Sequence, residues 1–242
     1  MSLRIQPLCL GRSIVDKAGL VLGLVPGTPA EICDLIWVIT GGQEAIVVDT
    51  GPADPEFSAR YHRVIQEWRS AASAVVSLGI DPERVKTVIN THLHWDHCYG
   101  NSLFKNASIY VQREELRYAV DPLPKDRRYY EADLGTLPFM AAHSNLVTIE
   151  GELEIASGVT LVPIPGHTPG MQGVAVETGD GIYFIASDAV GLFENWEQEP
   201  PNTGRIYVDL DQFHQSLAKI RGLADFVLPG HDPRVLDRKE YP

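Results

Sequence analysis

The stretch His92-Leu93-His94-Trp95-Asp96-His97 places three imidazoles and one carboxylate within six consecutive residues. Such side chains cannot share an apolar interior without partners, because buried polar groups must be hydrogen-bonded or bound to a metal. Imidazole nitrogen and carboxylate oxygen are ligands that Zn²⁺ and similar first-row cations accept. The stretch therefore predicts a metal site, and so many donors in so few residues favour more than one ion.

Three further donors follow predicted strands downstream. His167 comes after a strand over 160–164, Asp188 ends a strand over 182–187, and His231 follows a strand over 226–228. Loops at the ends of rigid strands are a usual position for functional side chains. These three residues are candidates to join the donors of 92–97.

Composition and charge exclude several classes of protein. The chain has 242 residues and a net charge of −12, so nucleic acids and anionic membrane surfaces are poor partners. No apolar run has the length of a membrane span, and no secretory signal is evident. The three cysteines (Cys9, Cys33 and Cys98) are odd in number and show no C-x-x-C spacing. We expect one domain over 1–242 in a reducing, cytoplasmic compartment.

The apolar pattern predicts a mixed order of strands and helices. Strands are expected over 35–40, 45–49, 85–90, 108–111, 153–155, 160–164, 173–177, 182–187 and 226–228, and helices over 54–78, 114–119 and 210–223. Residues 121–150 are less regular and are expected to form a helical insert or cap. Blocks of strands and helices favour sheets inside and helices outside.

The order of four motifs resembles the metallo-β-lactamase superfamily. H-x-H-x-D-H over 92–97 is followed by Gly-His-Thr-Pro-Gly over 166–170, by Ser187-Asp188 and by Pro229-Gly230-His231, and Val48-Asp49-Thr50-Gly51 matches a further short motif. The resemblance covers 35–231. It implies an α+β fold, the αββα sandwich, in which two mixed β-sheets pack face to face with helices outside and a binuclear site lies at one edge.

The resemblance also implies how the donors divide between two divalent cations. One ion takes His92, His94 and His167, the second takes Asp96, His97 and His231, and Asp188 bridges both. Asp49 is expected to orient the site without binding metal. Zn²⁺ is the expected cation, and Mn²⁺, Fe and Co²⁺ also suit this ligand set.

Two cations held in this way imply a hydrolase. A metal-bridging hydroxide attacks the substrate carbonyl, and Asp96 and Asp188 are the expected catalytic carboxylates that move a proton to the leaving group. The chain is most similar to the N-acyl-homoserine lactonase branch. Oxygen-reducing diiron members carry Glu in place of His94, and dizinc β-lactamases carry Cys in place of Asp188. We therefore expect a binuclear hydrolase of a lactone or other carboxylic ester.

Alternatives remain open at this point. They are a thioester or β-lactam hydrolase of the same fold, and an oxidoreductase like the mononuclear iron persulfide dioxygenases. Gly191 departs from the lactonase branch, which usually places Tyr three residues after the bridging Asp. Either Tyr207 or Trp196 replaces that Tyr, or the substrate differs.

The expected partner is a small, neutral or apolar ester or lactone, because no cluster of Lys or Arg adjoins the metal motifs in the sequence. Apolar pocket walls are expected from 20–36, 139–140 and 193–196. The segment 20–36 is either a flap over the site or half of a homodimer interface. His62, His143 and His214 match no motif and are expected to be surface or hydrogen-bonded residues, and Cys98 to be a small core residue.

Overall fold

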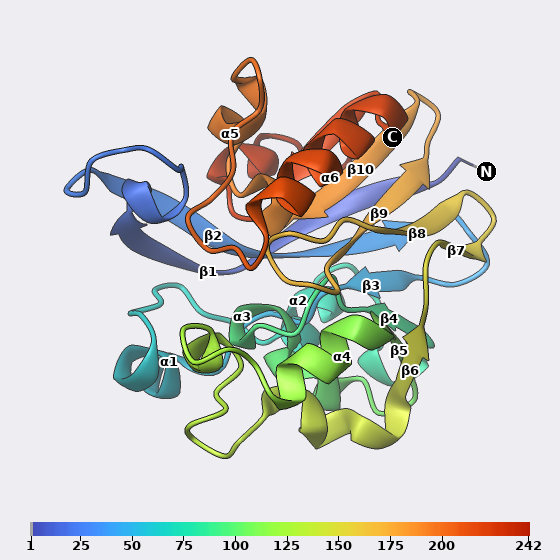
Figure 1. Cartoon of the computed structure of the whole chain (residues 1–242). Helices are drawn as coiled ribbons and strands as arrows, with labels where there is room; N and C mark the ends of the chain where they lie inside the picture. Colours follow the sequence, from blue (N-terminus) through green and yellow to red (C-terminus); the bar gives the residue numbers. More distant parts are fainter. Residues whose placement is uncertain (1) are drawn as a thin grey trace.

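The computed structural model describes residues 2–242, in which two β-sheets face each other between outer layers of helices (Figure 1). The first sheet has six strands in chain order: β1 (Arg4–Asp16), β2 (Pro29–Thr40), β3 (Ile46–Val48), β4 (Thr87–Ile89), β5 (Ser108–Gln112) and β6 (Leu146–Ile149). The strands β1, β2 and β3 pair antiparallel, whereas β3 to β6 run parallel.

The second sheet has five strands in the order β11-β10-β9-β8-β7. Its strands are β7 (Leu153–Ala156), β8 (Val159–Pro163), β9 (Gln172–Glu177), β10 (Ile182–Ser187) and β11 (Phe226–Pro229). Only β10 and β11 pair in parallel. The α-helices are α1 (Pro55–Tyr61), α2 (Ala71–Val76), α3 (Trp95–Cys98), α4 (Arg113–Val120), α5 (Phe193–Glu197) and α6 (Leu210–Leu223).

The apolar faces of the strands form three layers of core. Between the sheets, Trp37 and Ile89 of the first sheet pack in one cluster with Leu161 and Ile185 of the second. On the outer face of the first sheet the cluster includes residues of α2, and on the outer face of the second it includes residues of α6 (Figure 1). Burial of both sheet faces in this way confirms the αββα sandwich expected from the sequence.

Parallel strands place the candidate site. The neighbours β3 and β4 end at the same edge of the first sheet, and β10 and β11 end at the same edge of the second. The residues that follow these ends include Asp49, His92, Asp188 and His231. Side chains that lie far apart in the sequence therefore meet at one edge of the sandwich.

The predicted helix over 54–78 is wrong. The structure has the short helices α1 and α2 there, joined by an irregular segment. In that segment Gln66 exchanges backbone hydrogen bonds of 2.8 and 2.9 Å with Arg12 of β1, and Glu67 has a positive φ of 53°. Pairing with the edge strand competes with helix formation, although the apolar spacing is helical.

Other elements lay outside the sequence prediction. The strand β1 and the helix α5 were not expected, and β6 lies inside the region 121–150. That region otherwise contains short 3₁₀ turns at Arg127–Tyr129 and Pro138–Asn145, in place of a helical cap. No helix in the described part of the chain is long and apolar enough to cross a membrane. The assignment of one domain to the whole chain stays a prediction.

Candidate metal centre

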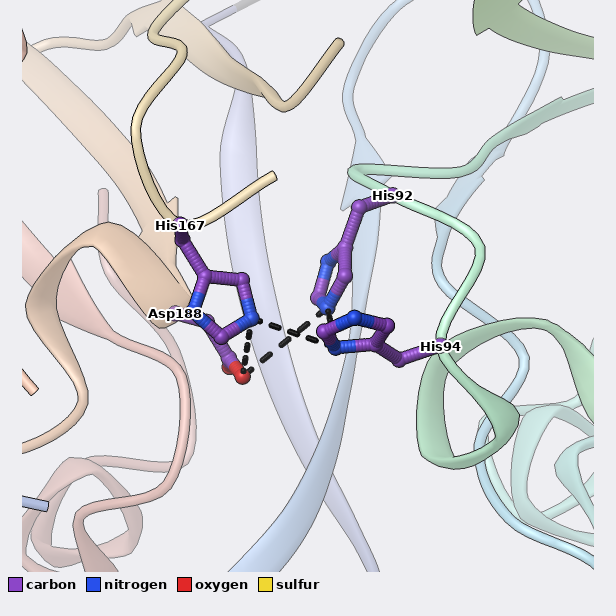
Figure 2. A group of neighbouring side chains, drawn as sticks. All are labelled: His92, His94, His167 and Asp188. Carbon is purple, nitrogen blue, oxygen red and sulfur yellow. Dashed lines mark hydrogen bonds and ion pairs between the residues drawn. The ribbon is translucent and has the colours of Figure 1, made fainter. Parts of the chain in front are cut away.

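The first group of donors comes from three loops on two sheets and is shown in Figure 2. The ligand atoms of His92, His94, His167 and Asp188 all lie within 4.8 Å of one another. His94 Nδ1 lies 3.0 Å from His92 Nε2 and 3.2 Å from His167 Nε2. His92 and His94 follow β4, and His167 follows β8, so the group joins the two sheets.

The second group consists of Asp96, His97 and His231, whose ligand atoms also lie within 4.8 Å of one another. Asp96 and His97 lie on the short helix α3, which turns them away from the strand direction of His92. His231 follows β11. All three side chains have little exposure to solvent.

Asp188 faces both groups with different oxygens. Its Oδ2 lies 3.3 Å from His167 Nε2 and 3.8 Å from His92 Nε2. Its Oδ1 lies 3.0 Å from His231 Nε2 and 3.3 Å from His97 Nε2. A carboxylate in this position can bridge two cations through its two oxygens.

Two orphaned atoms test whether these residues fit metal ions. His97 Nε2 and Asp188 Oδ1 are buried and have no hydrogen bond of acceptable geometry in the described chain, although Asp188 Oδ1 forms a close ion pair with His231 Nε2 (3.0 Å). Although they lie 3.3 Å apart, they do not form a hydrogen bond with each other, and a buried polar atom without a partner costs about 1–3 kcal/mol. A cation between the donors would interact with both atoms, so these residues fit a metal ion.

Hydrogen bonds fix which imidazole nitrogen faces the centre. His97 Nδ1 donates to Asp49 Oδ2 (2.9 Å), His167 Nδ1 donates to the carbonyl of Ile206 (2.8 Å), and His231 Nδ1 donates to the carbonyl of Cys33 (2.9 Å). In each of these rings Nε2 is therefore the nitrogen that faces the other donors. Such partners on the outer nitrogen are typical of histidines that bind metal.

The two groups differ in their electrostatics. Burial lowers the pKa of His92 and His94 well below the ordinary value, and it also lowers the pKa of His167. These imidazoles are therefore neutral, which is the form that binds a metal.

The second group lies among carboxylates. Burial opposes protonation of His97, but Asp188, Asp49 and Asp96 outweigh it and raise its pKa well above the ordinary value. At His231, burial is likewise outweighed by Asp188, which raises the pKa. This half of the centre therefore has a stronger demand for positive charge.

Glu115 of α4 supports the first group. Its buried carboxylate accepts hydrogen bonds from Leu93 N–H (3.0 Å), Gly170 N–H (3.2 Å), the hydroxyl of Tyr130 (2.9 Å) and the hydroxyl of Thr168. It thus ties the loop of His92 and His94 to the loop of His167. Sequence reasoning missed this residue.

Asp49 supports the second group, as the sequence comparison predicted for a residue that orients the site. Its carboxylate accepts hydrogen bonds from the Thr91 N–H and hydroxyl (both 2.8 Å) as well as from His97. Asp49 has a positive φ of 60°, which is unusual for a residue other than glycine. The strand end is thereby held in the conformation that orients the His97 ring.

An ion-pair network missed by sequence reasoning also borders the second group. The Arg63 guanidinium donates to Asp96 Oδ2 (3.1 Å) and to Asp34 Oδ1, and its Cζ lies 4.7 Å from the Trp95 ring centroid. Burial alone would raise the pKa of Asp96, but Arg63 outweighs it and holds the pKa below its usual range. Asp96 therefore remains a carboxylate. Arg63 lies in the segment wrongly predicted as helix, so no motif marked it.

A cavity of about 710 Å³ opens beside both groups. His94, Asp96, Asp188 and His231 contribute to its wall. Of the predicted apolar walls, only part of 20–36 is confirmed, through Leu20 and Ile32. The predictions for 139–140 and 193–196 are wrong, because neither segment lines the cavity. Phe139 packs with Leu93 in the core, and Trp196 packs in the cluster that includes α6.

The remaining expectations concern single residues. Tyr207 lines the cavity, as does Tyr129, whose ring centroid lies 5.0 Å from that of His94. Cys98 is buried and donates to the Leu93 carbonyl (Sγ to O, 3.4 Å), outside both groups. His62 bonds Glu131 (2.9 Å) and stacks on Trp95, so it is a hydrogen-bonded residue as expected, although it also lines the cavity.

Comparison with known proteins gives one family. The family model of the metallo-beta-lactamase superfamily matches residues 35–231. An N-acyl homoserine lactonase of Bacillus cereus is 30% identical over 209 residues, which are 80% of this chain and 78% of that protein. The N-acyl homoserine lactonase AttM of Azorhizobium caulinodans is 32% identical over 182 residues, covering 72% and 68%.

A solved structure agrees over nearly the whole chain. It is an N-acyl homoserine lactone hydrolase with the product N-hexanoyl-L-homoserine bound at its catalytic metal center. The two structures superpose with a TM-score of 0.82 at 25% sequence identity, and the match covers 98% of this chain and 96% of the other.

Proposed function

Because this chain belongs to the metallo-β-lactamase superfamily, we propose that it is a binuclear metal-dependent hydrolase that opens a lactone or cleaves another carboxylic ester. The observation that carries the proposal is Asp188, which turns one oxygen toward each group of histidines. The lactonase relatives support a lactone as the substrate. We also propose that the cofactors are two zinc ions and that the protein is cytoplasmic.

We propose that the first cation is held by His92, His94 and His167, the second by Asp96, His97 and His231, and that Asp188 belongs to both. When bound, the cations supply a water activated for attack and polarise the substrate carbonyl. His94, Asp96, Asp188 and His231 line the cavity, so a substrate bound there would lie against the proposed ligands.

Asp96 and Asp188 are the proposed catalytic carboxylates. Both line the cavity, so an oxygen of either can take a proton there and pass it to the leaving alkoxide. Tyr129 and Tyr207 also line the cavity. In the described chain neither hydroxyl has an intramolecular hydrogen bond, so both are proposed to replace the tyrosine absent at Gly191 in orienting the substrate carbonyl.

Metal analysis combined with a substrate panel tests the proposal. The purified protein should contain close to two divalent cations per chain and should hydrolyse N-hexanoyl homoserine lactone faster than a matched thioester or β-lactam. A chelator should abolish the activity, and Zn²⁺ should restore it. Full lactone hydrolysis by metal-free protein would contradict the proposal. A single iron with oxygen consumption would support the dioxygenase alternative instead.

A further inference from the structure

Four basic side chains from three separate segments of the chain line the cavity: Arg63, Lys125, Arg128 and Arg205. The carboxylates on the same wall are Asp16, Asp96, Asp126 and Asp188, of which Asp96 and Asp188 belong to the metal centre. Outside the metal donors, cations therefore outnumber carboxylates. The whole chain shows the opposite balance, with 20 Lys and Arg against 32 Asp and Glu.

Two of these cations are neutralised within the protein. Arg63 is paired with Asp34 and Asp96. The Lys125 ammonium lies 2.8 Å from both carboxylate oxygens of Asp126 and also donates to the Tyr207 carbonyl (2.8 Å). These two side chains can be explained without a ligand.

The other two cations have no such partner. Arg128 and Arg205 are exposed, and neither forms an ion pair with a carboxylate anywhere in residues 2–242. Arg205 donates one hydrogen bond, from Nη2 to the Leu24 carbonyl (3.2 Å). Asp16, the remaining carboxylate of the wall, accepts from the N–H groups of Ala18 and Gly27. Most of the donors of both guanidinium groups remain free.

Neighbouring contacts tie both arginines to the first group of metal donors. Arg128 Cζ lies 4.9 Å from the ring centroid of Tyr129, and that ring contacts His94. Arg205 directly precedes Ile206, whose carbonyl accepts the hydrogen bond from His167 Nδ1. Arg128 and Arg205 therefore belong to chain segments that contact His94 and His167 through the neighbouring residues Tyr129 and Ile206, and both line the same cavity.

We propose that the substrate carries an oxyanion, a carboxylate or a phosphate, in addition to the ester that is hydrolysed, and that Arg128 and Arg205 bind it. The planar guanidinium matches both oxyanions through paired hydrogen bonds. This inference rests on the proposed function. It replaces the expectation of a wholly neutral substrate, which followed from the absence of Lys and Arg next to the motifs in the sequence.

A matched series of homoserine lactones tests the inference. N-butanoyl and N-succinyl homoserine lactone differ at the end of the acyl chain, which is a methyl group in one and a carboxylate in the other, and the phosphonopropanoyl analogue distinguishes the two oxyanions. The metal-loaded wild-type protein should prefer an anionic lactone by about tenfold in kcat/KM, mostly through KM, as expected for a charge-assisted hydrogen bond. The preference should shrink at high salt.

Arg128→Gln and Arg205→Gln should each lower the anionic-to-neutral ratio of kcat/KM by several-fold, and the double variant should bring it close to one. Arg117→Gln is the matched control, because Arg117 is an exposed arginine of α4 outside the cavity and its substitution changes the net charge equally. A wild-type protein without anionic preference, or arginine variants with the wild-type ratio, would overturn the inference.

Binding of the ring-opened compounds separates this inference from the proposed function. Calorimetry should show N-succinyl-homoserine binding the metal-loaded protein more tightly than N-butanoyl-homoserine, and the Arg128→Gln/Arg205→Gln variant should lose the difference. If neither a lactone nor another carboxylic ester is hydrolysed but this difference is present, the proposed function fails and the anion site stands. If the lactones are hydrolysed and the difference is absent, the anion site fails.

Discussion

The two halves of the proposed metal centre use similar donors in opposite electrostatic surroundings. The first half has three histidines whose pKa values are lowered, first of all by burial. In the second half Asp49, Asp96 and Asp188 surround His97, and carboxylates raise the pKa of His97 and His231 in spite of burial. The ligands alone therefore do not describe this site, because supporting residues determine how strongly each half attracts a cation.

Removal of the shared carboxylate should have the largest effect, because it damages both halves. Asp188→Ala is expected to lower lactone hydrolysis by at least about 10³-fold, since metal-assisted charge stabilisation contributes several kcal/mol. Metal analysis should show loss from both positions. Asp180→Ala, at an exposed carboxylate before β10, is the control. Retention of two cations by Asp188→Ala would show that the halves are independent.

Glu115→Ala should damage the first half and the fold around it. The substitution leaves two backbone N–H groups and two hydroxyls without their acceptor, which should cost about 3 kcal/mol of unfolding free energy. Thermal unfolding should shift down by roughly 6–12 °C for a chain of this size. The exposed neighbour Glu114 provides the control variant Glu114→Ala. An unchanged Tm would show that Glu115 does not stabilise the fold around the first group.

Arg63→Met should weaken only the second half, because Arg63 orients Asp96. We expect about 10–100-fold weaker binding of one of the two cations, as found for residues that orient metal ligands. Chelator competition measures each equivalent separately, and Arg60→Met on the exposed face of α1 is the control.

Arg63→Met leaves Asp34 buried without its cation, so the variant carries a risk of misfolding. Arg63→Met/Asp34→Leu removes the uncompensated charge and should show the same selective loss in a folded protein. Equal weakening of both cations in this double variant would argue against a role specific to the second half.

A fall in pH should give the smallest effect and should affect the second half first. Protons compete with cations for imidazole nitrogen, and the raised pKa values of His97 and His231 mean that these rings take up protons at a higher pH than His92 and His94. Dialysis at steps between roughly pH 7 and pH 5 should release one equivalent of metal before the other. Release of both equivalents in a single step would show that the difference in histidine pKa between the two halves does not affect metal affinity.

Local patterns in the sequence predicted most strands and marked the seven donors as candidates. The resemblance to the metallo-β-lactamase superfamily predicted the sandwich and the grouping of His92 with His167, although 75 residues separate them. The supporting residues carry no such pattern. Glu115 lies on an ordinary helix, and Arg63 lies in a segment whose helical spacing was misleading because Gln66 pairs with β1.

The walls of the cavity were the least predictable part for the same reason. Arg128 and Arg205 stand in irregular segments far from every motif in the sequence, and only tertiary structure brings them to one cavity. An absence of basic residues beside a motif is therefore weak evidence about the charge of a pocket. The local motifs mark the proposed metal ligands, whereas the walls of the cavity are assembled from segments along the whole chain.

The position of Asp188 between the two histidine groups has a consequence for how the centre fills. Because Asp188 faces both groups, a cation held by one group would orient this carboxylate and attract its negative charge, and would thereby alter the affinity of the other group. By linkage, the second cation must alter the affinity of the first by the same factor. The titration curve of this protein with metal should therefore differ from that of two independent sites. Positive cooperativity would show that preorganisation of Asp188 outweighs repulsion between the cations, and negative cooperativity would show the reverse.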